Sequence, residues 1–262
     1  MKRRTKVWLI VAAVLFLIGT IMIVGDLIMV KFDFSKLSTV KFETNTYEIS
    51  EEFSDISIQT GTSDIIFLPT DEEIVKVVCS EDEKMKHTVA VQDGVLVIEL
   101  HNAKEWYDYI GISFGDKEKI KIYLPNKEYE KFSIKASTGD VKIQNLTLKT
   151  LDISVTTGDI KLEEIVCDSM STKGSTGDLR MKDVLANKTM TIQRTTGNVK
   201  FEKCDAPEIN IKVSTGDVKG SLLTEKIFIA KTSTGKIKVP KSVTGGKCEI
   251  TTSTGNIKIN YY

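Results

Sequence analysis

A six-residue string that recurs through the second half of the chain constrains its fold more than any other feature. The string reads Ser or Thr, Thr, Gly, then Asp, Asn or Lys, then a hydrophobic residue and a basic one. Successive glycines of the string are 19 or 20 residues apart. A fixed period of this size indicates stacked units, none of which can bury its own apolar face alone. The glycines are Gly139, Gly158, Gly177, Gly197, Gly216, Gly235 and Gly255.

Each repeat contains two segments with the alternation of a β-strand. Hydrophobic residues stand two and four places after the glycine, as Val141 and Ile143 do after Gly139, and a basic residue stands between them. A second apolar pair stands seven and five places before the glycine, as Phe132 and Ile134 do. A period of two is that of a strand with one buried and one solvated face. We therefore predict an all-β fold, a β-solenoid similar to a β-helix, with coils of 19–20 residues stacked about 4.8 Å apart.

The amino terminus predicts one transmembrane helix before the β-structure. An uncharged run from Val7 to Gly25 ends at Asp26 and is long enough, at about 28 Å, to cross a bilayer. Basic residues crowd the segment before it, which predicts a cytoplasmic amino terminus and an extracytoplasmic remainder. We expect an uncleaved signal anchor in the cell membrane. The alternative is a cleaved signal peptide, whose apolar region is usually shorter and ends in small residues.

The remaining sequence divides by regularity. Thr60-Gly61 is a degenerate copy of the repeated corner, and Asp93-Gly94 is typical of a hairpin turn between two strands. We predict that the less regular part forms the first coils and the cap over the amino-terminal end of the stack, where strand edges would otherwise be bare. The expected divisions are a cytoplasmic tail (1–6), a membrane anchor (7–25), a linker (26–45), an irregular amino-terminal β part and cap (46–131) and the regular solenoid repeats (132–262).

Four of these features together resemble a known family. They are Ile56-Ser57-Ile58 before Thr60-Gly61, the Asp93–Ile98 segment, the Trp106 segment leading to Ile120–Pro125, and the Ser-Thr-Gly-Asp-Val-Lys series. They resemble the bacterial β-strand-repeat "putative adhesin" family, a domain of unknown function that includes LiaG-like envelope proteins. The resemblance covers about residues 50–262. It implies a surface or cell-envelope protein linked to envelope stress response, and it brings no catalytic residues.

One column of basic residues is the candidate binding site. A cation stands three places after each glycine, at Lys142, Lys161, Arg180, Lys200, Lys219, Lys238 and Lys258. Stacked at sheet spacing, the seven would suit an anionic cell-wall polymer. A second, sparser line comprises Lys135, Lys173, Lys212 and Lys231. The competing interpretation is a solvated face, because Asp residues two places before four of the cations can neutralise them in exposed pairs worth roughly 0–1 kcal/mol each.

The sequence predicts no catalytic, cofactor or metal site. The four cysteines, Cys79, Cys167, Cys204 and Cys248, contain no C-x-x-C pair. Cys248 stands in the apolar column seven places before the glycine, and Cys204 shares a column with Leu146, Ile165, Val184 and Leu223, so we expect both to be core thiols, with a Cys167–Cys204 disulfide left open. His87 and His101 adjoin no nucleophile motif. The acidic clusters Asp71–Glu73 and Glu81–Glu83 are interpreted as solvated turns.

These features favour a non-catalytic envelope protein that presents a rigid surface for binding or adhesion, to an anionic polymer or to envelope proteins. Because Lys+Arg and Asp+Glu both total 36, the chain has no global attraction to nucleic acid. One alternative is a polysaccharide-active β-helix enzyme, which would need converging carboxylates. Another is a scaffold that self-associates through its carboxyl-terminal coil, whose last strand, Asn256–Tyr262, would be an unpaired edge, although the sequence leaves the oligomeric state open. Trp106, Tyr107 and Tyr109 are expected to seal the end of the stack rather than stack on a sugar.

Overall fold

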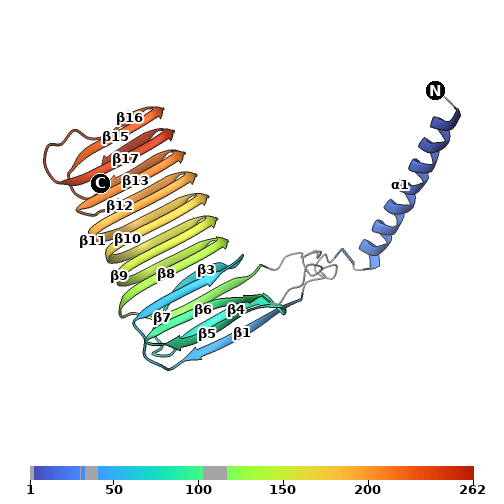
Figure 1. Ribbon diagram of the computed structural model, residues 1–262, viewed down its shortest axis with the longest axis horizontal. Coiled ribbons are helices and arrows are strands. Elements are labelled where there is room, and N and C mark those ends of the chain that lie inside the picture. The colour runs from blue at the N-terminus through green and yellow to red at the C-terminus, as the bar shows by residue number, and fades with distance from the viewer. Residues whose placement is uncertain (1–2, 30, 33–40, 103–116) are drawn as a thin grey trace. The chain divides into compact units, whose positions relative to one another are not determined.

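A computed structural model describes residues 3–29, 31–32, 41–102 and 117–262, which are mostly β-strand with one amino-terminal helix (Figure 1). The helix is α1 (Arg3–Met29). The strands are β1 (Phe42–Ile49), β2 (Asp55–Thr60), β3 (Asp64–Thr70), β4 (Val75–Asp82), β5 (Met85–Gln92), β6 (Val95–Asn102), β7 (Lys119–Pro125), β8 (Glu128–Thr138), β9 (Val141–Thr157), β10 (Ile160–Thr176), β11 (Leu179–Thr196), β12 (Val199–Cys204), β13 (Glu208–Thr215), β14 (Val218–Leu222), β15 (Lys226–Thr234), β16 (Ile237–Lys238), β17 (Gly246–Thr254) and β18 (Ile257–Tyr261).

Helix α1 has the length and composition of a membrane span. Its segment Thr5–Met29 reaches a mean hydropathy of 2.9, and none of that segment is buried against the rest of the chain. Apolar side chains such as Trp8 and Phe16 are therefore exposed. A helix of this kind near the amino terminus suggests either membrane anchoring or a signal sequence for secretion.

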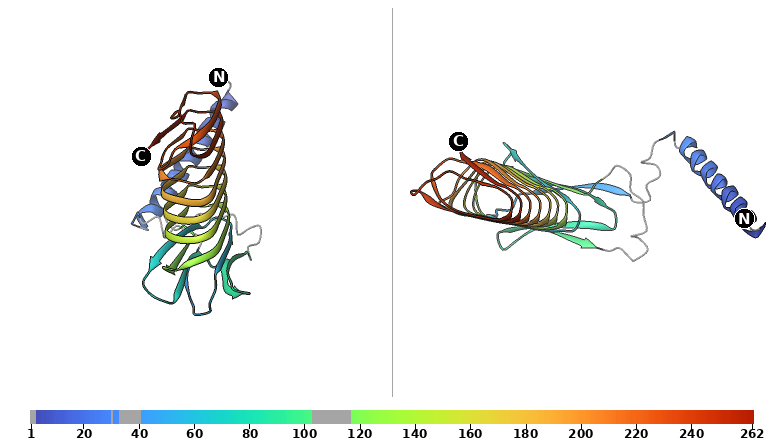
Figure 2. Two further views of the ribbon diagram at one scale, coloured as in Figure 1. Left: turned by 90° about the vertical axis from the view of Figure 1, so that its left-hand side faces the viewer. Right: turned by 90° about the horizontal axis from the view of Figure 1, so that it is seen from above.

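The repeats pair side by side as parallel strands in register. Lys161 of β10 lies opposite Lys142 of β9 and opposite Arg180 of β11. Met170 is likewise aligned with Leu151 and Met190. Figure 2 shows the turns of successive repeats one behind another. The alignment of equal positions expected from the period is thus confirmed.

The aligned hydrophobic columns form one continuous core. Val141, Ile160 and Leu179, each two places after a glycine, are at most 1% exposed. The columns before the glycine are buried in the same way, since Leu151 and Ile153 are at most 2% exposed. Because the inward side chains come from alternate positions, the basic residue between them faces outward.

The order of the repeats at the carboxyl end differs from their order in the sequence. β17 pairs with β13 on one side and with β15 on the other (Figure 1). β18 lies between β14 and β16. The last repeat is therefore enclosed, and the repeat of Gly235 is the outer one. The expectation that Asn256–Tyr262 would be an unpaired edge is wrong, because the chain turns back through residues 239–245 and inserts its last strands beside β13 and β14.

The amino-terminal end shows a similar exchange. β2 lies between β8 and β6, and β3 pairs with both β9 and β7. The Thr60-Gly61 corner thus belongs to the parallel ladder, where the Gly61 carbonyl accepts a hydrogen bond from Thr138 N at 2.7 Å. β4 pairs antiparallel with β7, and β5 pairs antiparallel with β6 through the predicted Asp93-Gly94 turn. β1 begins at Phe42, within the segment predicted as a linker.

Candidate functional site

The glycine of each repeat sets the corner from which the basic residue projects. Gly197 has φ +140, and a Cβ at this position would lie 2.0 Å from the carbonyl oxygen of Gly177 in the adjacent repeat. The other corner glycines from Gly139 to Gly255 also have positive φ and equally close backbone neighbours. Only glycine combines this conformation with such a close backbone approach. The corners therefore superpose, and the strands that follow them start at the same level.

The residue after each glycine links one repeat to the next. Asp178 N donates to Asp159 Oδ1 at 2.8 Å, and Asn198 N donates to Asp178 Oδ1 at 2.9 Å. The same backbone-to-side-chain hydrogen bond joins each repeat to the next, and we call the series the ladder. In spatial order its residues are Asp64, Asp140, Asp159, Asp178, Asn198, Asp217, Asn256 and Lys236. Lys236 stands in the outer repeat, where no further backbone N–H follows, so this position needs no acceptor. Sequence reasoning missed this role, although the Asp/Asn interchange preserves a side-chain oxygen.

The ladder also determines how far the basic column is neutralised. The backbone N–H of Asn198 lowers the pKa of Asp178, and that of Asn256 lowers the pKa of Asp217. The second oxygen of each carboxylate binds a cation, with Asp178 Oδ2 2.9 Å from Arg180 Nη2 and Asp217 Oδ2 2.7 Å from Lys219 Nζ. The predicted neutralisation is confirmed at these two cations.

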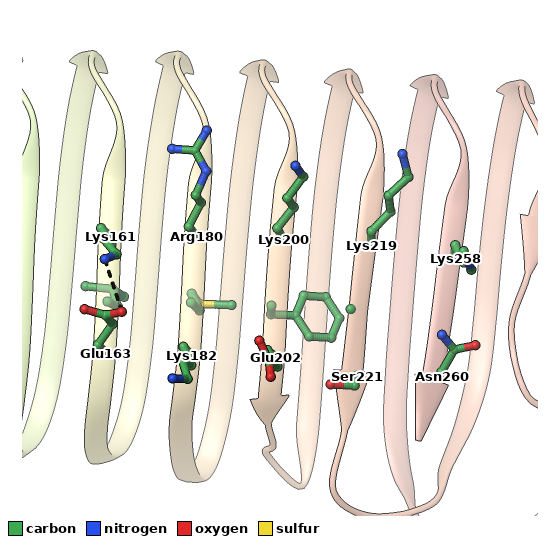
Figure 3. A pocket seen from close by; sticks show the side chains of 14 residues that line it. Lys161, Glu163, Arg180, Lys182, Lys200, Glu202, Lys219, Ser221, Lys258 and Asn260 are labelled. Atoms are coloured by element: carbon green, nitrogen blue, oxygen red, sulfur yellow. Dashed lines mark ion pairs between the residues drawn. The ribbon is translucent and has the colours of Figure 1, made fainter. Parts of the chain in front are cut away.

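The basic column forms an uninterrupted row across the repeats. Register places its members in the order Lys142, Lys161, Arg180, Lys200, Lys219, Lys258 and Lys238. Lys161 is paired with Glu163 at 3.1 Å. Within the described residues, no carboxylate forms an ion pair with the remaining four, Lys142, Lys200, Lys238 and Lys258. Five members appear side by side in Figure 3.

A shallow hollow of about 510 Å³ lies along this row. Its second border is the outward column two residues further on, which carries Glu163, Lys182, Glu202, Ser221 and Asn260 (Figure 3). The lining includes six cations and two carboxylates, so its charge is predominantly positive. Beneath it, the ring of Phe201 occupies the space beside Gly220, where a Cβ would lie 2.3 Å from the ring.

The second basic line is interrupted. Lys173 lies between Ser154 and Gln193, and Lys212 lies between Gln193 and Thr251. The line therefore alternates cations with neutral side chains, and a hollow of about 300 Å³ accompanies it.

Arg194 is an unexpected cation on the inward side of the same strands. It is 3% exposed, and its guanidinium nitrogens have no hydrogen-bond partner among the described residues. Burial lowers its pKa to about 10. The neighbour in register is Gly174, whose missing side chain leaves room for Nη1.

A buried polar cluster lies in the amino-terminal part, where none was predicted. Glu81 Oε2 is 2.6 Å from His87 Nδ1, and His87 Nε2 is 2.9 Å from Thr60 Oγ1. Thr60 in turn donates to Ser63 Oγ at 3.1 Å. His87 adjoins no nucleophile motif in the sequence, and the fold brings Thr60 to it while the turn between β4 and β5 brings Glu81. All four side chains are buried, with at most 6% exposure, so the hydroxyls do not face solvent.

Of the two acidic clusters interpreted as solvated turns, one is exposed and the other is largely buried. Asp71–Glu73 is exposed in a bend, as predicted. Glu81 and Asp82 are buried, so the solvated-turn interpretation is wrong for them: β4 continues through both residues. His101 lies exposed on β6.

The four cysteines are buried free thiols. Cys248 lies between Ile209 and Phe228, in the column predicted for it. Cys204 pairs with Leu222 rather than Leu223, because the register shifts after Phe201. Burial raises the pKa of Cys167 and of Cys204 to about 12, and the two thiols do not form the disulfide left open by the sequence. Trp106, Tyr107 and Tyr109 lie outside the described residues.

The structure is similar to solved structures of bacterial proteins. One is named as a putative adhesin from Bacteroides fragilis (TM-score 0.52, 19% identity), with 84% of this chain and 97% of that one covered. Another is named as a putative adhesin from Parabacteroides distasonis (TM-score 0.43, 15% identity), with 85% and 98% covered. A third is named as a putative cell adhesion protein from Clostridium sporogenes (TM-score 0.37, 15% identity), with 86% and 100% covered. The likeness to the Bacteroides fragilis protein, at 19% identity, shows a shared fold alone.

Comparison of the sequence itself identifies the family. No functionally curated protein matches the chain. The sequence profile of the toastrack DUF4097 family matches residues 53–262, which is all of the β-structure from β2 onward. The chain belongs to the toastrack DUF4097 family.

Proposed function

We propose that this protein is a non-catalytic, single-pass membrane protein whose β-solenoid lies outside the cytoplasm and binds an anionic polymer of the cell envelope. The apolar helix with basic residues before it supports the anchor and its orientation. The names of the similar structures refer to adhesion, which is consistent with a binding surface. Envelope stress response is the setting that the sequence resemblance implies for this binding.

Parallel pairing supports the solenoid. Each strand of a repeat pairs with its equivalent in the next repeat, and the inward columns join into one core. Strands that pair in this way are about 4.8 Å apart. The exchanges at both ends preserve the register, so they change the order of the coils and not their stacking.

The single observation that carries the binding proposal is the unbroken row of seven cations. One cation per coil places a positive charge about every 4.8 Å, on a surface held rigid by the ladder beneath it. Lys142, Lys200, Lys238 and Lys258 are not compensated by an ion pair within the described residues. A flexible polymer with regularly repeated negative charge can contact several of them together, and each contact is weakened by salt.

The hollow beside the row favours binding over polysaccharide cleavage. Among the described residues, Glu163 and Glu202 are the only carboxylates that line it, and Glu163 is already paired with Lys161. A glycosidase of the usual kind needs two carboxyl groups flanking the scissile bond, one of them as a proton donor. The described lining supplies mostly cations instead.

The test compares two triple variants in the full-length protein reconstituted in nanodiscs. Lys142→Gln/Lys200→Gln/Lys258→Gln removes three cations of the row, and Lys135→Gln/Lys173→Gln/Lys212→Gln removes the same charge from the second line. Binding to isolated wall polymer is measured over a salt titration. We expect the first variant to lose at least tenfold in affinity and to have a shallower salt dependence, with a smaller change in the second. Equal losses in both variants would mean a general charge effect, and salt-insensitive binding would remove the row from the proposal.

Self-association is a second candidate, supported by the outer edge of the Gly235 repeat. Ile227, Ile229 and Ile237 there are 39–45% exposed, and β15 and β16 each have a strand on one side only among the described strands. Such an edge can template pairing with another chain. Sedimentation of the full-length protein over a range of concentrations, with Ile229→Lys as the variant, tests this possibility.

A further inference from the structure

We propose that Cys79, Glu81 and His87 form a binding site for a divalent transition-metal ion of the zinc class. Cys79 and Glu81 are two residues apart on β4, so both side chains point to the inward face of that strand. His87 lies on β5, just beyond the turn that follows β4. The donor atoms of the three side chains lie within 4.8 Å of one another.

The three side chains are enclosed by protein. Cys79 and Glu81 are 0% exposed and His87 is 3% exposed. Clusters of exposed carboxylates are common on protein surfaces without any ion, whereas a buried carboxylate beside a thiol and an imidazole is an arrangement that requires compensation. The small separation of the three donors means that a shift of side chains within the cluster is enough to surround one ion.

Hydrogen bonds already hold two of the ligands, Glu81 and His87, in place. Asn45 Nδ2 donates to Glu81 Oε1 at 2.8 Å, and the backbone N of His87 donates to Glu81 Oε2 at 2.7 Å. Thr60 Oγ1 lies 2.9 Å from His87 Nε2. Metal-binding histidines usually donate their second ring N–H to an oxygen, and metal-binding carboxylates are themselves hydrogen-bonded. Glu81 has the second feature, and Thr60 Oγ1 is placed to accept from Nε2–H once Nδ1, the nitrogen directed toward Glu81, binds the ion.

Charge balance favours a divalent ion. A thiolate, a carboxylate and a neutral imidazole carry two negative charges, which one divalent cation cancels, leaving a buried site without net charge. Binding of an ion requires the Cys79 thiol to lose its proton to solvent. It also requires the proton between His87 Nδ1 and Glu81 Oε2 to leave Nδ1 for Nε2, where it can donate to Thr60 Oγ1.

The donor set selects the kind of ion. Sulfur and imidazole nitrogen suit zinc, cobalt and copper, whereas magnesium and calcium prefer oxygen ligands alone. Three protein ligands leave one position of a tetrahedral ion for water. The sequence offered no C-x-x-C or H-x-x-x-H spacing to indicate the site, because its ligands are grouped by strand alternation in β4 and by the turn between β4 and β5.

Cobalt(II) provides the test, since thiolate ligation to this ion gives a charge-transfer absorption band. The full-length protein in detergent, reduced and stripped of metal by a chelator, is titrated with CoCl₂ and then with ZnCl₂. We expect one cobalt per chain with a thiolate band, and zinc should abolish that band. Cys79→Ala should remove the band and weaken binding at least tenfold. Cys167→Ala, which removes an equally buried thiol with no histidine beside it, should leave both unchanged.

His87→Gln provides an independent variant should Cys79→Ala fail to fold, as judged by circular dichroism. It too should weaken cobalt binding at least tenfold. Absence of a thiolate band in the unmutated protein would overturn the proposal by itself. A band that persists in either variant would place the ion elsewhere and would also overturn it.

Discussion

The backbone nitrogen of Asn256 donates a hydrogen bond to Oδ1 of Asp217 at 2.7 Å, although 39 residues separate them in the chain. The intervening repeat of Gly235 lies on the far side of Asn256, where Lys236 N donates to Asn256 Oδ1 at 3.0 Å. The ladder of side-chain oxygens thus records the spatial order of the repeats, and the residue without such an oxygen marks its end.

The corner glycines should be intolerant of any side chain. Gly197→Ala places a Cβ 2.0 Å from the Gly177 carbonyl oxygen at φ +140, and we expect a loss of at least about 3 kcal/mol in the free energy of unfolding. Urea denaturation measures it. Gly94→Ala is the matched control, because φ there is +76 but no atom lies within 4 Å of the added Cβ. That variant should lose only about 1–2 kcal/mol, and equal losses would show that conformation, not backbone approach, dominates.

The acceptor should matter more than the charge in the ladder. Asp217→Asn retains the oxygen that accepts from Asn256 and loses only the charge and its ion pair with Lys219, so it should cost about 0–1 kcal/mol in the free energy of unfolding. Asp217→Ala leaves that N–H without its partner and should cost about 1–2 kcal/mol. Lys236→Ala, in the same column but with no following N–H, should be nearly neutral. Thermal or urea unfolding of the three variants measures these differences. A loss of stability in Asp217→Asn as large as that in Asp217→Ala would contradict the role of the side-chain oxygen as acceptor.

Stability should decline in acid through the same residues. The folded-state pKa values of Asp178 and Asp217 lie below the ordinary 3.8, so the unfolded chain takes up these protons first as the pH falls. Their contribution is complete above the unfolded pKa and is lost as the pH falls through the folded one. We expect the free energy of unfolding to drop below about pH 4, and to drop less steeply in Asp178→Asn/Asp217→Asn. If the free energy of unfolding fell as steeply with pH in that double variant, the loss of stability in acid would not come from Asp178 and Asp217.

Hydrogen exchange should detect the exchanged order of the last repeats. Because β18 is paired on both sides, its amides should exchange more slowly than those of β15 and β16, although β18 lies at the carboxyl end. Mass-spectrometric exchange of peptides covering 226–238 and 246–262 compares them. Faster exchange in the second peptide would mean that the repeats stack in sequence order.

Gly174 and Arg194 should be energetically coupled. Gly174→Ala places a Cβ 1.7 Å from Arg194 Nη1, and overpacking of this kind costs about 1–3 kcal/mol. Arg194→Val matches its column neighbours Val155 and Val213 and removes a buried cation without a hydrogen-bond partner. In the double variant the cost of Gly174→Ala should largely disappear. Additive effects in the unfolding free energies would show that the guanidinium does not occupy the space beside Gly174.

The repeating pattern was sufficient to predict the columns. Alternation in a strand is a local property, so a regular period predicts which side chains are buried and which share a row, and the alignment from Lys142 to Lys219 follows from it. The predicted hairpin at Asp93-Gly94 rests on equally local turn chemistry. The basic row can be recognised from the sequence alone for this reason.

Tertiary structure alone decided which repeats are neighbours and which buried polar groups meet. Nearly identical repeat strings can pair with one another in several orders at similar local cost, so the period cannot specify that β17 lies between β13 and β15. The path of residues 239–245 and the packing of the ends select one order. The buried polar cluster also depends on the fold, because Thr60 lies 27 residues from His87 in the chain and the sequence carries no shared local signal for their contact. Glu81 and His87 meet across the turn between β4 and β5.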